Sequence, residues 1–346
     1  VLMTVQFVVA IAFMSGTAIV FRQMNFLRGQ PLGFEKNLVV TLPLNSQNNI
    51  NAVFRPGDAN IRQRMNAFDE ELLKHPNIEA VTQSVAPPGM GAVSRNIWTD
   101  KVLQEDNFFT PVYAVDYDFA ETFELALVAG REFDLSYGTD HISSFVINEQ
   151  AVKDLKWESP EAALDQRLVV EGKEGKVVGV IKDFHFRSML AAIEPLVMEV
   201  NAGAFGYFNV RLKDGDLAGT LAFMEEKGTD FFPAKSFEYN FLDETLDQAY
   251  EAQDQLGTLI GYFAFLAIFI SCFGLFGLAA LLTKRRFREI GIRKVLGAQP
   301  GQILVLLAKD FVWLIGVSLC LALPLCWYFL TNWMEDFPYR ARKSVL

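Results

Sequence analysis

The chain has 346 residues, of which 51% are apolar, with a formal net charge of −10 and a positive mean hydropathy. This apolar content exceeds that of an ordinary soluble domain. The acidic balance argues against nucleic acid as a partner.

The apolar residues gather in three stretches, 1–21, 256–282 and 311–333. Between the first two, residues 23–250 have ordinary globular composition, with 20 Lys and Arg against 35 Asp and Glu, a net charge of −15. This length is sufficient for one large domain or two small ones. The three cysteines lie in apolar stretches, so we expect the large domain to fold without disulfides.

The first apolar stretch reads VLMTVQFVVAIAFMSGTAIVF and ends before Arg22. A signal peptide is the alternative, but its apolar region is usually only about 7–15 residues long. We therefore predict a first transmembrane helix within residues 1–22.

Short β-rich runs and amphipathic helical patterns alternate over residues 35–250, which predicts an α+β domain. The expected strands are 37–44, 78–85, 110–115, 145–148, 167–170, 176–181 and 208–212, and the expected helices are 59–74, 149–155 and 217–227.

The polar stretch 243–255 has neither Gly nor Pro before Leu256. Nothing local therefore interrupts a helix that runs from the domain into the second apolar stretch. We expect one continuous helix over 243–281, which would transmit motion rigidly; a break at the membrane is the alternative.

The second span, 255–283, contains 26 consecutive uncharged residues, Leu256 to Leu281. This exceeds the roughly 20 residues that cross a bilayer. The loop 284–301 follows, and its cations place it in the cytoplasm by the positive-inside rule. These cations are Lys284, Arg285, Arg286, Arg288, Arg293 and Lys294.

The last span is expected within 303–333. Pro300-Gly301 favours a separate short apolar helix over 302–309, followed by a span over 311–333 with a kink at Pro324; a span that starts at Ile303 is the alternative. The predicted orientation has the N-terminus inside, the large domain outside, the basic loop inside and the C-terminus outside.

The stretch FGLFGLAALLTKRRFREIGIRKVLGA resembles the signature of FtsX-like, MacB-type ABC transporter permeases, in particular a group common in Bacteroidetes. The segments FVINEQAVKDLKW, VVGVIKDFHF, FLDETLDQAY and LPLCWYFLTNWMEDFPYR are similar to the same family, in the expected order. The resemblance covers essentially the whole chain, and EIGIRKVLGA is its most specific part.

This resemblance implies α-helical membrane spans, three of them here, and a large α+β extracytoplasmic domain of the MacB periplasmic-core type over 35–250, followed by an FtsX-like permease region over 255–346. It also implies a multi-pass protein of the bacterial inner membrane with the domain in the periplasm. The family has a further helix after the last span seen here, so we expect a C-terminal half that lacks its last helix. Dimerisation through the membrane helices is a further expectation.

In this family a separate ABC ATPase subunit binds ATP and grips the cytoplasmic loop, so the resemblance implies no cofactor in this chain. A basic loop that only sets topology and touches lipid headgroups is the alternative. The matching polar residues are Arg285, Arg288, Glu289, Arg293 and Lys294, and the apolar residues expected to be buried by the partner are Phe287, Ile290, Ile292, Val295 and Leu296, with Gly291 and Gly297 between them.

Other chemistry has little support. Asp183 and His185 would share one face of a strand, which we interpret as a solvated or core-edge pair, and Gly172-Lys173 lacks the rest of a phosphate loop. We expect a permease subunit that is not itself an enzyme. A receptor whose external domain binds a ligand is the alternative, but the short loop 284–301 leaves no room for a signalling domain.

Overall fold

The computed structural model describes residues 2–44, 59–103, 105, 108–233, 236–248, 250–295, 299–335 and 337–339. The chain forms two compact units. One comprises residues 1–30 with 250–346, and the other comprises residues 31–249.

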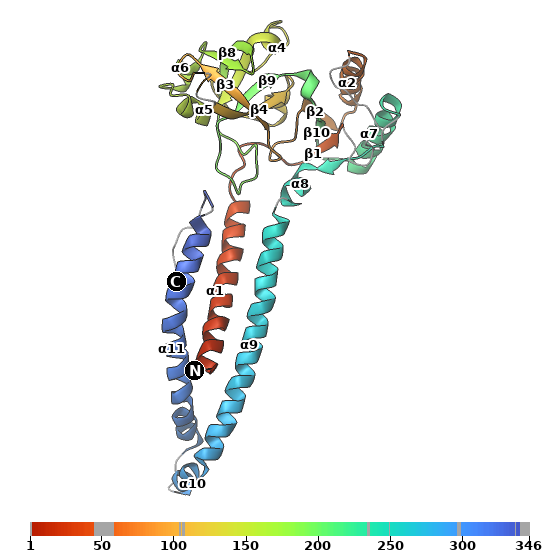
Figure 1. The fold of residues 1–346 in the computed structure, drawn as a ribbon. Helices are drawn as coiled ribbons and strands as arrows, with labels where there is room; N and C mark the ends of the chain where they lie inside the picture. The colour runs from red at the N-terminus through yellow and green to blue at the C-terminus, as the bar shows by residue number, and fades with distance from the viewer. Residues whose placement is uncertain are drawn as a thin grey trace. The chain divides into compact units, whose positions relative to one another are not determined.

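The first unit is built from long apolar helices (Figure 1). They are α1 (Leu2–Arg28), α9 (Glu251–Arg285) and α11 (Pro300–Glu335), with the short helix α10 (Phe287–Val295) between the last two. Among the described residues, three segments are long and apolar enough to cross a membrane, namely Leu2–Arg28, Asp254–Arg285 and Phe311–Glu335. The prediction of three membrane spans is confirmed.

Helix α1 packs against both α9 and α11. Small residues of α9 face α1: a Cβ added at Gly257 would lie 3.2 Å from Val20, and one added at Gly274 would lie 2.9 Å from the side-chain oxygen of Gln6. Glycines at such positions allow two membrane helices to approach closely. On the other side, the hydroxyl of Ser318 lies 3.3 Å from the carbonyl oxygen of Thr4.

The third span differs from the expected separate helix over 302–309. Residues 300–335 form one helix, which begins at Pro300 and contains Pro324. Proline is well tolerated at the first position of a helix, where its missing N–H would have no partner in any case. The Pro300-Gly301 pair therefore begins one long helix, and residues 302–309 are its first part and not a separate helix.

The second unit contains a four-stranded antiparallel sheet in the order β11-β1-β10-β2, with Val39 of β1 opposite Arg211 of β10. Helix α2 connects β1 to β2, and α7 connects β10 to β11, which is the split β-α-β arrangement of ferredoxin-like folds. The bounds are β1 (Val39–Pro43), α2 (Ala59–Leu72), β2 (Ile78–Ser84), β10 (Tyr207–Leu212), α7 (Leu217–Phe231) and β11 (Asn240–Phe241).

Between β2 and β10 the chain forms a closed barrel in the order β4-β3-β7-β8-β6-β9, which the parallel pairing of β4 with β9 completes. Its strands are β3 (Val93–Thr99), β4 (Phe108–Val115), β6 (Ser144–Asn148), β7 (Arg167–Val170), β8 (Lys173–Ile181) and β9 (Val197–Val200). Strand β5 (Leu127–Gly130) pairs with β8, and short helices connect the strands: α3 (Phe119–Thr122), α4 (Asp140–Ser143), α5 (Glu149–Asp154), α6 (Pro160–Ala163) and a 3₁₀ turn at Ala202–Ala204.

All seven predicted strands and all three predicted helices of this domain are present. Two of the helices begin at side-chain caps, because Asn148 accepts a hydrogen bond from the N–H of Ala151 and Asp216 accepts one from the N–H of Gly219. Strands β3, β5, β9 and β11 were not predicted from the sequence, because they are short or lack clean alternation of apolar and polar residues.

The expected continuous helix over 243–281 is wrong. Helix α8 (Leu242–Gln248) ends before α9 begins at Glu251, and Tyr250 occupies the N-cap position of α9. Leu242 and Leu246, one turn apart on α8, are buried in the core of the α+β domain. Tertiary packing thus fixes α8 within that domain, and local helix propensity carries no information about such packing.

Candidate functional site

The predicted coupling residues lie on a short helix after the second span. Helix α9 ends at Arg285, and Arg286 forms a turn in which its N–H donates to the carbonyl oxygen of Leu282 at 3.0 Å. Helix α10 then carries nine of the predicted residues, 287–295. Gly291 sits inside this helix, where glycine costs about 1 kcal/mol relative to alanine, so α10 is only marginally favoured by propensity.

Apolar side chains form a stripe along α10. Phe287, Gly291 and Val295 are four residues apart and therefore lie on one face, with Ile292 beside them. Phe287 is 74% exposed, Ile292 62% and Val295 88%. Within the described part of the chain, this stripe is not covered.

The charged edge of α10 is ordered by an ion pair of 2.7 Å between Arg293 and Glu289, one turn apart. Exposed pairs of this type stabilise a helix by about 0.2–0.5 kcal/mol. Arg288 is also exposed, and Arg285 is exposed at the end of α9. The loop therefore offers apolar and cationic groups together on one small surface.

The remaining predicted residues are placed as follows. Ile290 is half-buried. Lys294 lies in α10, but its side chain is outside the described part of the structure, as are Leu296 and Gly297. Of the predicted apolar contact residues, Phe287, Ile292 and Val295 are thus available on the surface of this chain.

The described residues of the α+β domain contain no cluster of side chains that would form a catalytic or metal site. Strand β8 ends at Ile181, so the expected placement of Asp183 and His185 on a strand is wrong; Asp183 instead accepts a hydrogen bond of 2.8 Å from the N–H of Gln150. In the described ranges, no group of three His, Cys, Asp or Glu could hold a metal ion.

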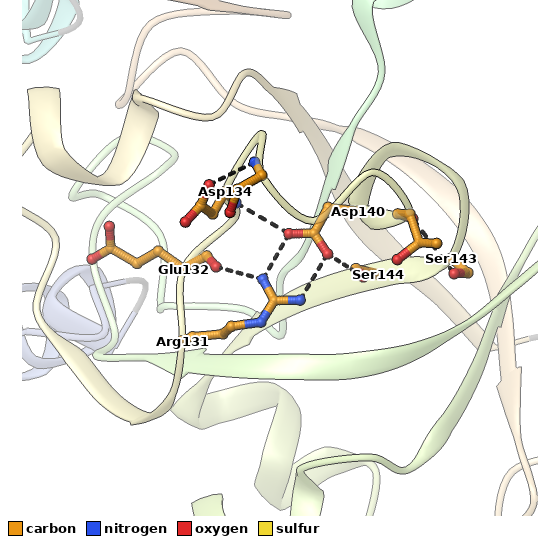
Figure 2. A network of polar contacts seen from close by, with 8 residues as sticks. Arg131, Glu132, Asp134, Asp140, Ser143 and Ser144 are labelled. Carbon is orange, nitrogen blue, oxygen red and sulfur yellow. Dashed lines mark hydrogen bonds and ion pairs between the residues drawn. The ribbon is translucent and has the colours of Figure 1, made fainter.

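The domain does contain a buried ion pair that orders the loop after β5 (Figure 2). The two terminal nitrogens of the Arg131 guanidinium, Nη1 and Nη2, donate to Asp140 at 2.6 and 2.8 Å, and the Ser144 hydroxyl and the Asp134 N–H donate to the same carboxylate. Burial would raise the pKa of Asp140, but these hydrogen bonds outweigh burial and hold its pKa below the usual value. The Asp140 side chain is fully buried, so this pair is a structural element and not a surface site.

A second polar cluster joins α2 to the sheet. The Gln83 side chain donates to Asp69 of α2, while the Gln83 N–H donates to Asp116 at 2.5 Å and the Thr82 hydroxyl donates to the other oxygen of Asp116. Removal from water raises the pKa of Asp116 to about 7. Burial and the nearby Asp116 also raise the pKa of Asp69 well above its usual value.

We expect Asp116→Asn to flatten the pH dependence of stability. The folded state holds a proton on Asp116 that the unfolded state releases above about pH 3.9, so the wild type loses stability as the pH rises from about 4 to 7, by at most about 1.4 kcal/mol per pH unit. The amide cannot ionise, and its oxygen and nitrogen can still pair with Gln83 and Thr82. Thermal unfolding of the full chain in detergent at pH 5 and pH 8 measures the difference. The control Asp165→Asn, at an exposed carboxylate, should follow the wild type, and parallel pH profiles for Asp116→Asn and the wild type would contradict the assignment.

Comparison with protein families gives two matches. Residues 8–223 match the MacB-like periplasmic core domain, and residues 261–338 match the FtsX-like permease C-terminal region. No curated protein matches the chain.

Two solved structures are similar to parts of the chain. The periplasmic region of MacB from Actinobacillus actinomycetemcomitans is 14% identical, with a TM-score of 0.44 over 65% of this chain and 98% of that one. The extracellular domain of the noncanonic ABC-type transporter YknZ from Gram-positive bacteria is 12% identical, with a TM-score of 0.42 over 58% of this chain and 98% of that one.

Three apolar spans, an α+β domain between the first and second spans, and the family matches together define a membrane permease with an extracytoplasmic domain. The chain belongs to the family of FtsX-like, MacB-type ABC transporter permeases, because the periplasmic-core match alone covers more than half of it. Members of this family are the permease components of ABC-type transporters and work with ABC ATPase partners.

Proposed function

We propose that this chain passes motion driven by ATP hydrolysis in a separate ATPase subunit to its extracytoplasmic domain. ATP would bind to the partner, and the chain itself would carry out no catalysis. The proposal includes a location in the bacterial inner membrane, with the α+β domain in the periplasm and α10 in the cytoplasm. It also includes dimerisation through the membrane helices.

The exposed stripe of α10 is the observation that carries this proposal. Phe287 and Val295 leave large apolar surfaces uncovered next to the Arg293–Glu289 pair. An amphipathic helix of this type fits into a hydrophobic groove of a partner protein, with its charges at the rim. A helix that lies in the lipid interface would use the same apolar stripe and cations, so the family relationship favours the ATPase and the pull-down below decides between them.

We expect the double change Arg288→Glu with Arg293→Glu to abolish recovery of the ATPase. The change reverses two exposed cations and also replaces the partner of Glu289 with a second carboxylate one turn away, so it disrupts both the rim charges and the helix. The measurement is a pull-down from detergent extract, with the full chain as bait and the ATP-binding-cassette subunit as the recovered protein.

Two further variants make this result specific. Arg62→Glu with Arg64→Glu makes the same charge change on exposed residues of α2 in the α+β domain, and recovery should stay at the wild-type level. Phe287→Ser with Val295→Ser leaves every cation in place, so topology is preserved while the apolar stripe is lost; recovery should fall. Wild-type recovery with both α10 variants would show that the ATPase docks elsewhere.

A further inference from the structure

The segment Asp183–Arg187, which begins two residues after the end of β8, has buried aromatic side chains and a structural role. Phe184 and Phe186 are almost completely buried, and His185 is 7% exposed. The segment belongs to neither a strand nor a helix. It lies instead between the two parts of the domain that lead to the membrane helices in the chain.

The first of these connecting parts, residues 31–34, follows α1. The N–H of His185 donates to the carbonyl oxygen of Leu32 at 2.9 Å. Gly33 has a positive φ of 83°, and a Cβ at this residue would lie 2.9 Å from the Cα of Phe184, closer than real Cβ atoms approach a backbone. The ring of Phe34 then packs edge-on against Phe184, with ring centres 6.3 Å apart.

The second connecting part is α8, which precedes α9. The carbonyl oxygen of Phe186 accepts hydrogen bonds from the N–H groups of Gly89 and Gly91, at 3.1 and 2.8 Å. Gly89 in turn lies against α8, because a Cβ there would come 2.1 Å from the Cδ2 of Leu246. Leu246 shares one buried core cluster with Phe184 and Phe186.

An unbroken series of contacts therefore runs from Leu32 and Gly33 through residues 184–186 to Gly89 and Leu246. We propose that the segment Asp183–Arg187 ties the two connecting parts together, so that a displacement of either one is transmitted to the other and the domain responds to its two chain connections as a single body. This inference deepens the proposed function: the tie itself is argued from contacts within the domain, and only its role in transport rests on the proposed function. Packed cores have discrete arrangements and transmit displacement, whereas separate flexible tethers would respond independently.

Native-state hydrogen exchange of the full chain in detergent tests the tie without any ATPase, so its result is independent of the docking proposal. Gly33→Ala should raise exchange not only at residues 32–35 but also, by about tenfold or more, at the amides of Gly89, Gly91 and α8. Coupling between sites is reciprocal, so Leu246→Ala should likewise raise exchange at the amide of His185. Leu246→Ala keeps the test decisive if Gly33→Ala does not fold.

Gly172→Ala is the matched control. Gly172 has a similar φ of 91°, but nothing lies within 4 Å of its added Cβ, so this variant carries the backbone strain without the contact. It should leave exchange at α8 unchanged, and amides of α7 should be unaffected in every variant. Faster exchange confined to the neighbourhood of each substitution, with α8 unmoved by Gly33→Ala and His185 unmoved by Leu246→Ala, would overturn the proposal.

Discussion

Asp140→Ala should destabilise the α+β domain by about 3 kcal/mol, in the range found when one partner of a buried ion pair is removed. The substitution leaves the Arg131 guanidinium, whose side chain is 32% exposed, without its carboxylate. It also removes the acceptor for the Ser144 hydroxyl and for the N–H of Asp134. Thermal or denaturant unfolding of the full chain in detergent measures the loss.

The control for this prediction is Glu174→Gln, which breaks an exposed ion pair of 2.6 Å with Arg167. Exposed pairs contribute little to stability because water screens them, so this variant should unfold close to the wild type. The depressed pKa of Asp140 also predicts a pH dependence. The contribution of the ionised carboxylate to stability is present above about pH 3.9 and is lost as the pH falls below that value. Equal losses for the two variants would contradict a special role for the buried pair.

Phe68→Ala should cost about 3–5 kcal/mol, the usual loss for removing a buried phenylalanine ring. Phe68 is 1% exposed on α2 and packs edge-on against Phe208 of β10, with ring centres 5.1 Å apart, and against Phe232 at 5.5 Å. The cavity left by this ring would lie where α2 and α7 meet the sheet, so the ferredoxin-like part should unfold first.

Phe109→Ala is the matched control, because Phe109 is 63% exposed on β4. It loses the same ring without opening a buried cavity, and we expect a change within about 0.5 kcal/mol. Hydrogen exchange resolved by segment distinguishes the two cases: Phe68→Ala should expose amides of α2, β10 and α7. A similar cost for Phe109→Ala would mean that burial at Phe68 is not the cause.

The sequence determined the features that depend on composition and local pattern. Membrane spans can be predicted from runs of uncharged residues, because the free energy of transfer from water to lipid is nearly additive along the chain. The cations after Thr283 predict the orientation of these spans. Strands such as 167–170 and helices such as 59–72 carry their own periodicity and end signals. The stretch EIGIRKVLGA also pointed to the family, and the comparisons bear this out.

Tertiary structure alone decided how these pieces close and where they stop. The barrel closes because β4 pairs with β9 across a long separation in sequence, which no local window contains. Helix α8 packs in the α+β domain because Leu242 and Leu246 are buried beside Phe123, Phe184 and Phe186, and it ends at Gln248 although its own sequence favours continuation. The segment Asp183–Arg187 likewise gains its role only from neighbours distant in the chain. Local propensity is worth tenths of a kcal/mol per residue, whereas burying a single large apolar side chain is worth about 1.5–3 kcal/mol, so the core prevails where the two disagree.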